Sequence, residues 1–143
     1  MLSQKARYAL RAMIELARED GQVTAGALAE RADAPRKFLE AILLSLSREG
    51  LVVSRRGKFG GYVLGRPAEQ INFAEIIRLV DGPLALTPCV SRTAFRRCED
   101  CRDLATCALR EALLRARDAT AAVLEGYSVA DAAKGVGAEL IEG

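Results

Sequence analysis

Four cysteines are the residues in this 143-residue sequence whose type and spacing point most directly to chemistry. Three of them, Cys98, Cys101 and Cys107, lie within the ten-residue stretch CEDCRDLATC, and Cys89 precedes this stretch. Thiolates bind metal ions and iron–sulfur clusters, and paired thiols form disulfides. We expect the chain in the cytoplasm, where such a group of cysteines is more typical of a metal, cluster or redox site than of a structural disulfide framework.

The spacing leaves more than one kind of site open. A C-x2-C step such as Cys98 to Cys101 suits a tetrahedral zinc site built from four thiolates, although the other spacings match no familiar zinc ribbon. A reversible disulfide between two of Cys98, Cys101 and Cys107 is a second alternative, and chemically inert thiols are a third. Positive charges that favour a reactive thiolate stand close by at Arg96, Arg97 and Arg102.

The residue types argue against catalysis. The sequence contains no histidine, so the usual serine–histidine and cysteine–histidine dyads are absent. Gly57, Gly60 and Gly61 do not connect a strand to a helix, as a phosphate-binding loop requires. The C-x2-C step also lacks the strand–helix–strand pattern of thioredoxin-like oxidoreductases. We predict that the chain is not an enzyme.

The basic residues are concentrated in the first half of the chain. Residues 1–66 contain 12 lysines and arginines against 7 acidic residues, whereas residues 67–143 contain 9 against 12. This asymmetry predicts that the first part contacts a polyanion. Mean hydropathy is only +0.08. No apolar run approaches the roughly 18 residues that a membrane span needs, so we expect no membrane association.

The order of elements in the basic half suggests how a polyanion would be bound. Helical periodicity predicts helices over residues 3–20, 24–32 and 35–50. The second and third, joined by a tight turn, resemble a helix-turn-helix. Residues 51–53 and 62–64 have the composition of two short strands around the basic, glycine-rich stretch SRRGKFGG, which predicts a β-hairpin wing.

Seven side chains of this unit are candidate DNA contacts. Near the start of a recognition helix, arginine can bind guanine and glutamate can accept from cytosine. We expect an arginine of the wing, best Arg56, to enter a narrow minor groove, and Tyr62 either to bind a phosphate or to pack within its strand. The candidates are Arg36, Lys37 and Glu40 on the third helix, and Arg55, Arg56, Lys58 and Tyr62 on the wing.

The second half of the chain is predicted to position the cysteines. A helix capped by the pair Asn72 and Glu75 is expected over residues 72–82, an irregular loop over 84–103 and a long helix over 104–125. The apolar face of the long helix needs a partner, and we expect it to pack on the first helix and on its own copy in a homodimer. That face comprises Leu109, Ala112, Leu113, Ala116, Ala119, Thr120, Val123 and Leu124.

Together these elements predict a mainly α fold with a small β-hairpin wing. Residues 1–66 would form a winged helix-turn-helix DNA-binding domain, and residues 67–143 a cysteine-bearing loop with dimerisation helices. Ser128 and Asp131 form a capping pair for a short last helix.

The stretch KFLEAILLSLSREGLVVSRRGKFGGYVLGRPAEQI resembles the recognition helix and wing of the Rrf-two (Rrf2) family of bacterial winged helix-turn-helix transcriptional regulators, which includes the IscR, NsrR and RirA types. The similarity extends to ARYALRAMIELA and to CALREALLRARDATAAVLEGYSVADA, so it covers nearly the whole chain. The resemblance implies a homodimer, with the long helix at its interface, that binds a partly palindromic operator and usually represses transcription.

The resemblance also implies an iron–sulfur cluster, of the 2Fe–2S or 4Fe–4S kind, in the cysteine loop. Cys101-x5-Cys107 matches the last two cysteines of the family's cluster motif, while Cys89 and Cys98 both compete for the first position. The histidine that the IscR type places three residues after the last cysteine is replaced by Arg110. The implied ligands are therefore the four cysteines. Other members lack a cluster and respond to a partner protein, which keeps a cluster-free regulator open.

Overall fold

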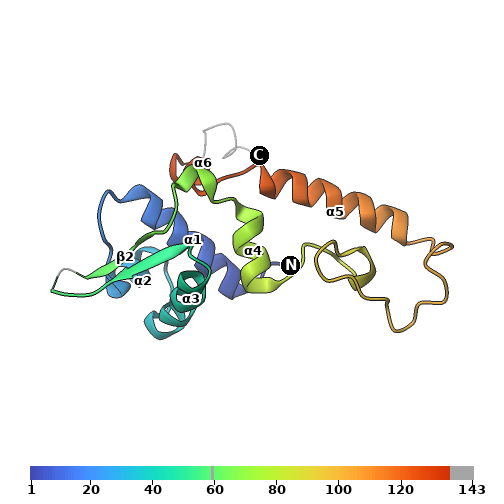
Figure 1. The fold of residues 1–143 in the computed structure, drawn as a ribbon, viewed down its shortest axis with the longest axis horizontal. Coiled ribbons are helices and arrows are strands. Elements are labelled where there is room, and N and C mark those ends of the chain that lie inside the picture. Colours follow the sequence, from blue (N-terminus) through green and yellow to red (C-terminus); the bar gives the residue numbers. More distant parts are fainter. Residues whose placement is uncertain (59, 136–143) are drawn as a thin grey trace.

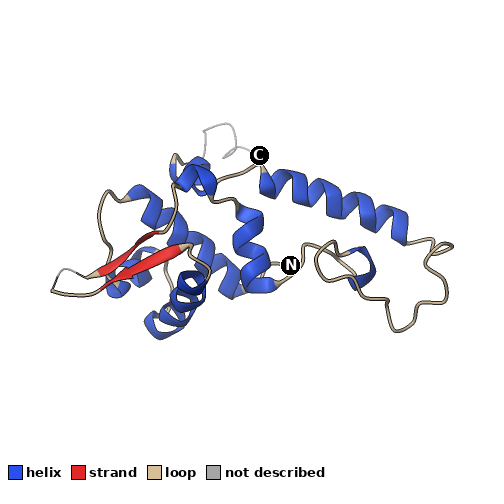
Figure 2. Ribbon diagram, viewed as in Figure 1, coloured by secondary structure: helices blue, strands red, loops and turns tan. Residues whose placement is uncertain are grey.

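Helices account for most of the structure, and a two-stranded antiparallel hairpin projects from one end (Figure 1, Figure 2). The computed structural model describes residues 1–58 and 60–135. Within these residues no helix is long and apolar enough to cross a membrane. In chain order the elements are α1 (Gln4–Arg18), α2 (Ala25–Arg31), α3 (Arg36–Arg48), β1 (Val52–Arg55), β2 (Gly61–Leu64), the 3-10 turn η1 (Ala68–Gln70), α4 (Phe73–Asp81), the 3-10 turn η2 (Pro88–Val90), α5 (Arg110–Glu125) and α6 (Val129–Ala133).

Elements from both halves of the chain pack around α1. Its N-cap Ser3 accepts a hydrogen bond from the Ala6 backbone N–H at 2.9 Å, which fixes the start of the helix. α2, α3, α4, α6 and β2 all contact α1. Alanines on its buried face let these neighbours approach closely, while Met13 and Leu16 fill the centre of the core. The buried residues of α1 are Ala6, Tyr8, Ala9, Leu10, Ala12, Met13 and Leu16.

α2 and α3 form the predicted helix-turn-helix. Thr24 caps α2 by accepting a hydrogen bond from the Ala27 backbone N–H at 3.2 Å. Asp33, with a φ of 52°, provides the left-handed residue of the tight turn. α3 begins at Arg36, one residue later than predicted, because Pro35 has an extended backbone, with ψ at 131°, and forms the N-cap. The buried face of α3 comprises Leu39, Ile42, Leu43 and Leu46.

The wing follows α3 directly, as predicted. β1 and β2 pair antiparallel, with Val52 opposite Leu64. Val23 extends this ladder by exchanging two backbone hydrogen bonds with Tyr62, at 3.0 and 2.8 Å. Gly61 permits the close approach, because a Cβ at this position would lie 2.5 Å from the Val23 carbonyl oxygen. The segment before α2 therefore fixes the base of the wing relative to the helix-turn-helix.

α4 and α6 join the same hydrophobic core. Asn72 caps α4 by accepting from the Glu75 backbone N–H at 2.9 Å. The Glu75 carboxylate pairs with Arg66, so it does not complete the predicted capping pair. At the start of α6, Ser128 and Asp131 do form a complete capping box. Both helices contact α1, so one core includes residues from both halves of the chain.

α5 is shorter than the predicted helix and has different neighbours. It begins at Arg110 and not near residue 104, because the Asp103 carboxylate accepts from the Ala105 backbone N–H at 3.0 Å and holds a turn that competes with the helix. Cys107 therefore lies before α5. The main contacts of α5 are with α4 and η2, and not with α1 as predicted. α5 and the cysteine loop extend away from the wing (Figure 1).

The outer face of α5 is left uncovered within one chain. Ala121 is the buried residue of this helix, and Leu109 and Val123, on the other side, are 69% and 68% exposed. Apolar residues on that side follow the alternating three- and four-residue spacing of a coiled-coil seam. Small residues along a seam let two helices approach closely, so we expect a second copy of α5 to cover it. The seam comprises Leu109, Ala112, Ala116, Ala119 and Val123.

We predict that Ala119→Glu separates the dimer into monomers, whereas Ala122→Glu, the same change on the exposed polar flank of α5, does not. In a symmetric pair of helices two glutamates in the seam would face each other. Like charges at an interface cost several kcal/mol, which raises the dissociation constant roughly 100-fold or more. Light scattering over a concentration series measures the effect. A wild-type protein that stays monomeric at micromolar concentration contradicts the homodimer.

Candidate functional site

All four cysteines line one cavity of about 400 Å³ between the loop over residues 84–109 and the start of α5. Cys89 is buried, Cys98 and Cys101 are half-buried, and Cys107 is exposed. All four are free thiols. The structure thus gathers the residues that were predicted to act together, although they come from positions up to 18 residues apart. The charged residues that also line the cavity are Asp100, Arg102, Asp103 and Arg110.

The thiols are gathered but do not form a finished metal site. Among the residues that the structure describes, no three cysteine, aspartate or glutamate side chains are placed to hold a metal ion. A cluster or a zinc ion would therefore have to draw the loop inward. The loop can move inward because few of its side chains are buried. Across residues 84–109 the buried side chains are Cys89, Val90 and Ser91.

The Cys89 thiol has the most specific surroundings of the four. The Thr87 hydroxyl lies 3.3 Å from the Cys89 Sγ, and this hydrogen bond lowers the pKa of the thiol. The Cys98 thiol and the charge of Arg110 also lower the Cys89 pKa, while burial opposes them. The contact with Cys89 raises the pKa of Cys98. The Thr87 hydroxyl and the Arg110 charge therefore favour the thiolate form of Cys89.

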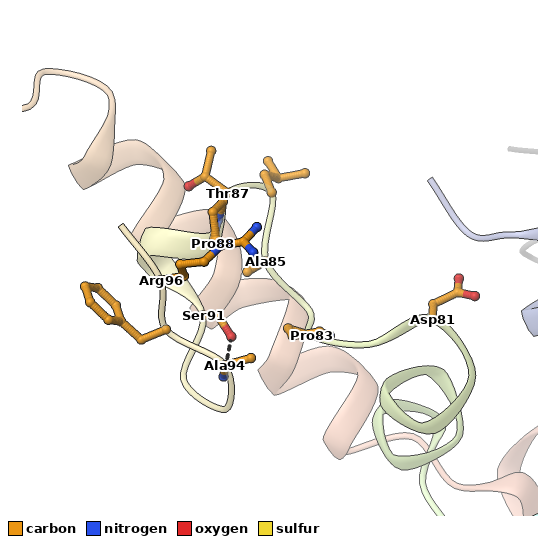
Figure 3. Close-up of a pocket in the computed structure, with 10 residues that line it drawn as sticks. Asp81, Pro83, Ala85, Thr87, Pro88, Ser91, Ala94 and Arg96 are labelled. Carbon is orange, nitrogen blue, oxygen red and sulfur yellow. Dashed lines mark hydrogen bonds between the residues drawn. The ribbon is translucent and has the colours of Figure 1, made fainter. Parts of the chain in front are cut away.

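A tight backbone turn brings Cys98 back toward Cys89. The Arg96 N–H donates to the Pro88 carbonyl oxygen at 3.1 Å. Within this turn the Ala94 N–H donates to the Ser91 Oγ at 2.9 Å, along the wall of a second cavity of about 640 Å³ (Figure 3). The loop and the shared cavity thus bring Cys98 toward Cys89, which lies outside the trio that is predicted to supply a disulfide.

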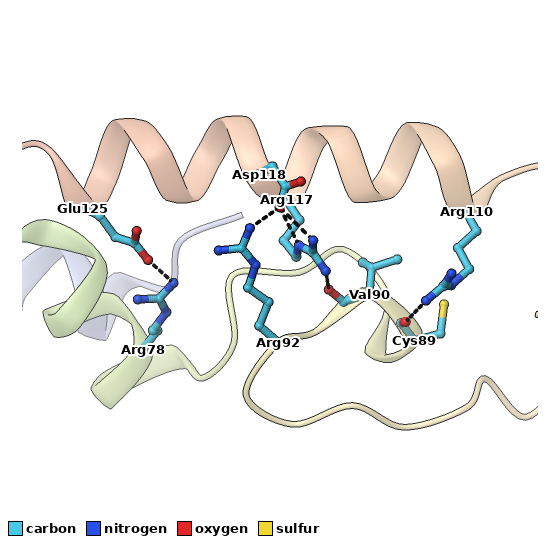
Figure 4. Close-up of polar contacts among 8 residues, drawn as sticks. All are labelled: Arg78, Cys89, Val90, Arg92, Arg110, Arg117, Asp118 and Glu125. Carbon is cyan, nitrogen blue, oxygen red and sulfur yellow. Dashed lines mark hydrogen bonds and ion pairs between the residues drawn. The ribbon is translucent and has the colours of Figure 1, made fainter.

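Two arginines of α5 hold the backbone next to Cys89 (Figure 4). Arg110 Nη2 donates to the Cys89 carbonyl oxygen at 3.4 Å, and Arg117 Nη1 donates to the Val90 carbonyl oxygen at 2.8 Å. Seven residues make two helical turns, so both side chains leave the same face of α5. Arg117 and Thr87 are site residues that the predictions from sequence do not include. The seven-residue spacing of the arginines was the available signal.

Ion pairs extend these contacts along α5 (Figure 4). Asp118 accepts from Arg117 at 2.7 Å and from Arg92, a loop residue, at 2.6 Å. Arg117 and, to a lesser extent, Arg92 lower the pKa of Asp118. At the other end of the helix, Arg78 of α4 pairs with Glu125 at 2.7 Å. The loop and α4 are therefore both fastened to α5.

Arg110 also presents an unsatisfied donor beside the cysteine cavity. Its Nε is buried and has no hydrogen-bond partner among the described residues. A buried N–H without a partner is costly, especially on a charged group. An anion in the adjoining cavity would satisfy it. Thiolates and thiolate-ligated iron–sulfur clusters are both anionic, so the charge of Arg110 suits either occupant.

The candidate DNA contacts lie on α3 and on the wing. Arg36 Nε pairs with Glu40 at 3.2 Å across one helical turn, and both side chains remain accessible. Tyr62 is half-buried and packs against the core, which favours its structural role over a phosphate contact. The basic side chains among these candidates, Arg36, Lys37, Arg55, Arg56 and Lys58, are all exposed.

The family follows from comparison with known proteins. The sequence profile of Rrf2, described as an iron-dependent transcriptional regulator, matches residues 2–135. The chain belongs to the Rrf2 family. A Rhodobacter capsulatus protein named as an rrf2-like HTH-type transcriptional regulator is 42% identical over 116 residues, which span 78% of this chain and 77% of that protein.

Two solved structures of Rrf2 relatives extend the likeness to three dimensions. The structure of CymR, the global cysteine regulator of Bacillus subtilis, matches with a TM-score of 0.77 and 34% identity, over 94% of this chain and 96% of CymR. IscR of T. potens matches with a TM-score of 0.74 and 26% identity, over 94% of this chain and 86% of that one. These findings confirm the predicted family and fold class. This Rrf2 chain is a transcriptional regulator, and its relatives are named as regulators, not as enzymes.

We predict that Arg117→Gln loosens the turn at η2 in this Rrf2 protein, whereas Arg115→Gln does not. Arg117 donates to the Val90 carbonyl, whereas Arg115 makes an exposed ion pair one turn away on its own helix. Losing a charged hydrogen bond of about 1.5–3 kcal/mol speeds local opening roughly 10-fold or more. Amide hydrogen exchange at Ser91 and Arg96 measures this change. Equal exchange rates in the two variants contradict the anchoring role.

Proposed function

We propose that this Rrf2 protein binds operator DNA as a homodimeric repressor and that an iron–sulfur cluster held by the loop cysteines modulates the binding. The observation that carries the proposal is the convergence of all four thiols on one cavity. Four thiolates are the ligand set of 2Fe–2S and 4Fe–4S clusters. The unsatisfied Nε of Arg110 suits the negative charge of such a cluster. The ligands would be Cys89, Cys98, Cys101 and Cys107.

The residues around the cavity explain how the site would act on the rest of the chain. When bound, a cluster supplies a group that responds to iron supply and to oxidants. Cys89 stands on η2, which Arg110 and Arg117 fasten to α5, and Cys107 lies just before the first residue of α5. Drawing the thiols together would order both ends of the loop against α5. The outer face of that helix is the expected dimer interface.

DNA recognition is assigned to α3 and the wing. In a dimer the two copies of α3 would address half-sites about one turn of DNA apart, roughly 34 Å. Arg36, Lys37 and Glu40 would face base edges, and Arg56 would enter the minor groove. A change in the crossing of the two α5 helices would alter the spacing of the α3 helices and hence operator affinity.

A second candidate function is thiol oxidation as the signal, and the placement of Cys89 and Cys98 on one cavity favours it. The same four thiolates also suit zinc, and control by a partner protein would need no cofactor. Metal analysis of anaerobically purified protein separates iron from zinc, and a metal-free regulator would show neither.

We predict that Arg36→Ala and Arg56→Ala each weaken operator binding by about 1–3 kcal/mol and relax its sequence preference. Lys58→Ala removes a phosphate contact, so it should weaken binding to DNA of every sequence by the same factor and reduce the salt dependence of the affinity. The control Arg115→Ala lies on α5 and leaves operator affinity unchanged. Titration of operator and unrelated DNA at several salt concentrations measures these effects. Unaltered operator affinity in both arginine variants contradicts the assignment.

We predict that wild-type protein reconstituted anaerobically with iron and sulfide acquires a visible iron–sulfur spectrum, whereas Cys101→Ala and Cys107→Ala do not. Thr106→Ala, which changes the same cavity wall without removing a thiol, is the matched control and retains the spectrum. Loaded and cluster-free protein should differ in operator affinity by about 1–3 kcal/mol, the usual size of an allosteric coupling. Wild type that takes up no iron, or equal affinity of both forms, refutes the cluster as the signal.

A further inference from the structure

We propose that Cys89 and Cys98 are a reversible disulfide pair that forms when the cluster-free protein meets a hydroperoxide. The inference rests on the proposed function only in that it concerns the same four thiols. Its first support is geometric: both thiols line the cysteine cavity, and a backbone hydrogen bond joins the segment that carries Cys89 to the segment just before Cys98. Cys89 is buried within the protein but faces this cavity, which is large enough to admit a small oxidant.

The backbone, and not only the side-chain rotamers, brings the two cysteines together. The hydrogen bond from the Arg96 N–H to the Pro88 carbonyl, at 3.1 Å, joins the residue just before Cys89 to a residue two positions before Cys98. The bond from the Ala94 N–H to the Ser91 Oγ closes the turn between them. A disulfide requires the two Cα atoms to be near each other. A closed turn between Cys89 and Cys98 meets that need without a large movement of the loop.

The other two cysteines are placed differently. Cys101 follows Cys98 by one short turn, in which the Cys101 N–H donates to the Cys98 carbonyl at 3.1 Å. Cys107 is exposed and is separated from Cys98 by the turn at Asp103. The described contacts pair neither of these thiols with Cys89. The first disulfide to form should therefore be the one between Cys89 and Cys98.

The reaction proceeds in two balanced steps. Cys89 faces the cavity, has the Thr87 hydroxyl 3.3 Å from its sulfur and has the Arg110 guanidinium at its own carbonyl, so we assign it the first attack. Its thiolate attacks one peroxide oxygen and the O–O bond breaks. The other oxygen takes up the proton that the thiol released and departs as an alcohol or water. Cys89 is then a sulfenic acid. The Cys98 sulfur then attacks the Cys89 sulfur, the S–S bond forms and water leaves. Two thiols are oxidised and one hydroperoxide is reduced.

The disulfide and the cluster exclude each other, because both would use Cys89 and Cys98. The neutral disulfide would also leave the Arg110 Nε without the anion that a cluster supplies. Peroxide would thus hold the cavity in a state that cannot take up iron until a thiol reductant restores both cysteines.

The test treats iron-free, full-length protein with hydrogen peroxide, blocks the remaining thiols and maps linked peptides by mass spectrometry. We expect wild type to lose two free thiols and to yield a peptide that links Cys89 to Cys98. Cys101→Ser and Cys107→Ser should form the same link. Cys98→Ser should instead stop at a sulfenic acid on Cys89 that dimedone traps. A dominant link between any other pair, or no loss of thiols in wild type, overturns the proposal.

Iron uptake in the same preparations distinguishes this inference from the proposed function. Oxidised wild type should fail to take up iron, and dithiothreitol should restore uptake. Protein that forms the link between Cys89 and Cys98 but never binds iron keeps the inference and refutes the cluster. Protein that binds iron but forms no such link keeps the cluster and refutes the inference.

Discussion

Hydrogen bonds from α5 to two consecutive backbone carbonyls, those of Cys89 and Val90, hold the cysteine loop in place. The loop has no hydrophobic core that could do this. Across positions 84–109 the buried residues are three consecutive ones, Cys89, Val90 and Ser91. Arg110 and Arg117 bind the backbone carbonyls of the first two. The shape of the cavity therefore depends on Arg110 and Arg117 more than on apolar packing. A loop held by a few polar contacts can be rearranged by chemistry at its thiols, whereas a packed core would resist.

The same helix connects the cavity to the DNA-binding elements through physical contacts. Arg78 of α4 pairs with Glu125 near the end of α5. At the end of α4, Asp81 accepts from the Ser3 backbone N–H at 2.9 Å, at the N-cap of α1. α1 in turn contacts α2, α3 and β2. A displacement of α5 would thus reach α3 through one surface ion pair, one surface hydrogen bond and helix α1. Surface contacts can adjust, whereas α1 moves with the helices packed on its buried face, so a rigid-body shift is the favoured response.

The sequence was most informative where structure is set locally. The caps Thr24 and Asn72 and the box at Ser128 identify helix starts to within a residue, because the capping side chain acts on a backbone N–H only three positions away. Long-range contacts were not predictable. Periodicity alone extended α5 back to residue 104, since it could not show that Asp103 would bind a backbone N–H. The placement of Cys98 and Cys89 on one cavity depends on how the loop between them closes, and cysteine spacing does not contain that information.

The charge of the cavity explains why its chemical states can act differently on α5. Arg110 lies at the first turn of the helix, where the backbone dipole adds to its positive charge, and its buried Nε lacks a partner. Thiolates or a thiolate-bound cluster place negative charge against this end of the helix, whereas a disulfide places none. Oxidation would therefore change both the covalent closure of the loop and the electrostatic attraction that holds it to α5. Arg110 also donates to the Cys89 carbonyl, so its guanidinium contacts both the loop backbone and the cavity that the thiols line. A histidine at this position could ligate metal, but it would lack the permanent charge that lets Arg110 distinguish an anionic cavity from a neutral one.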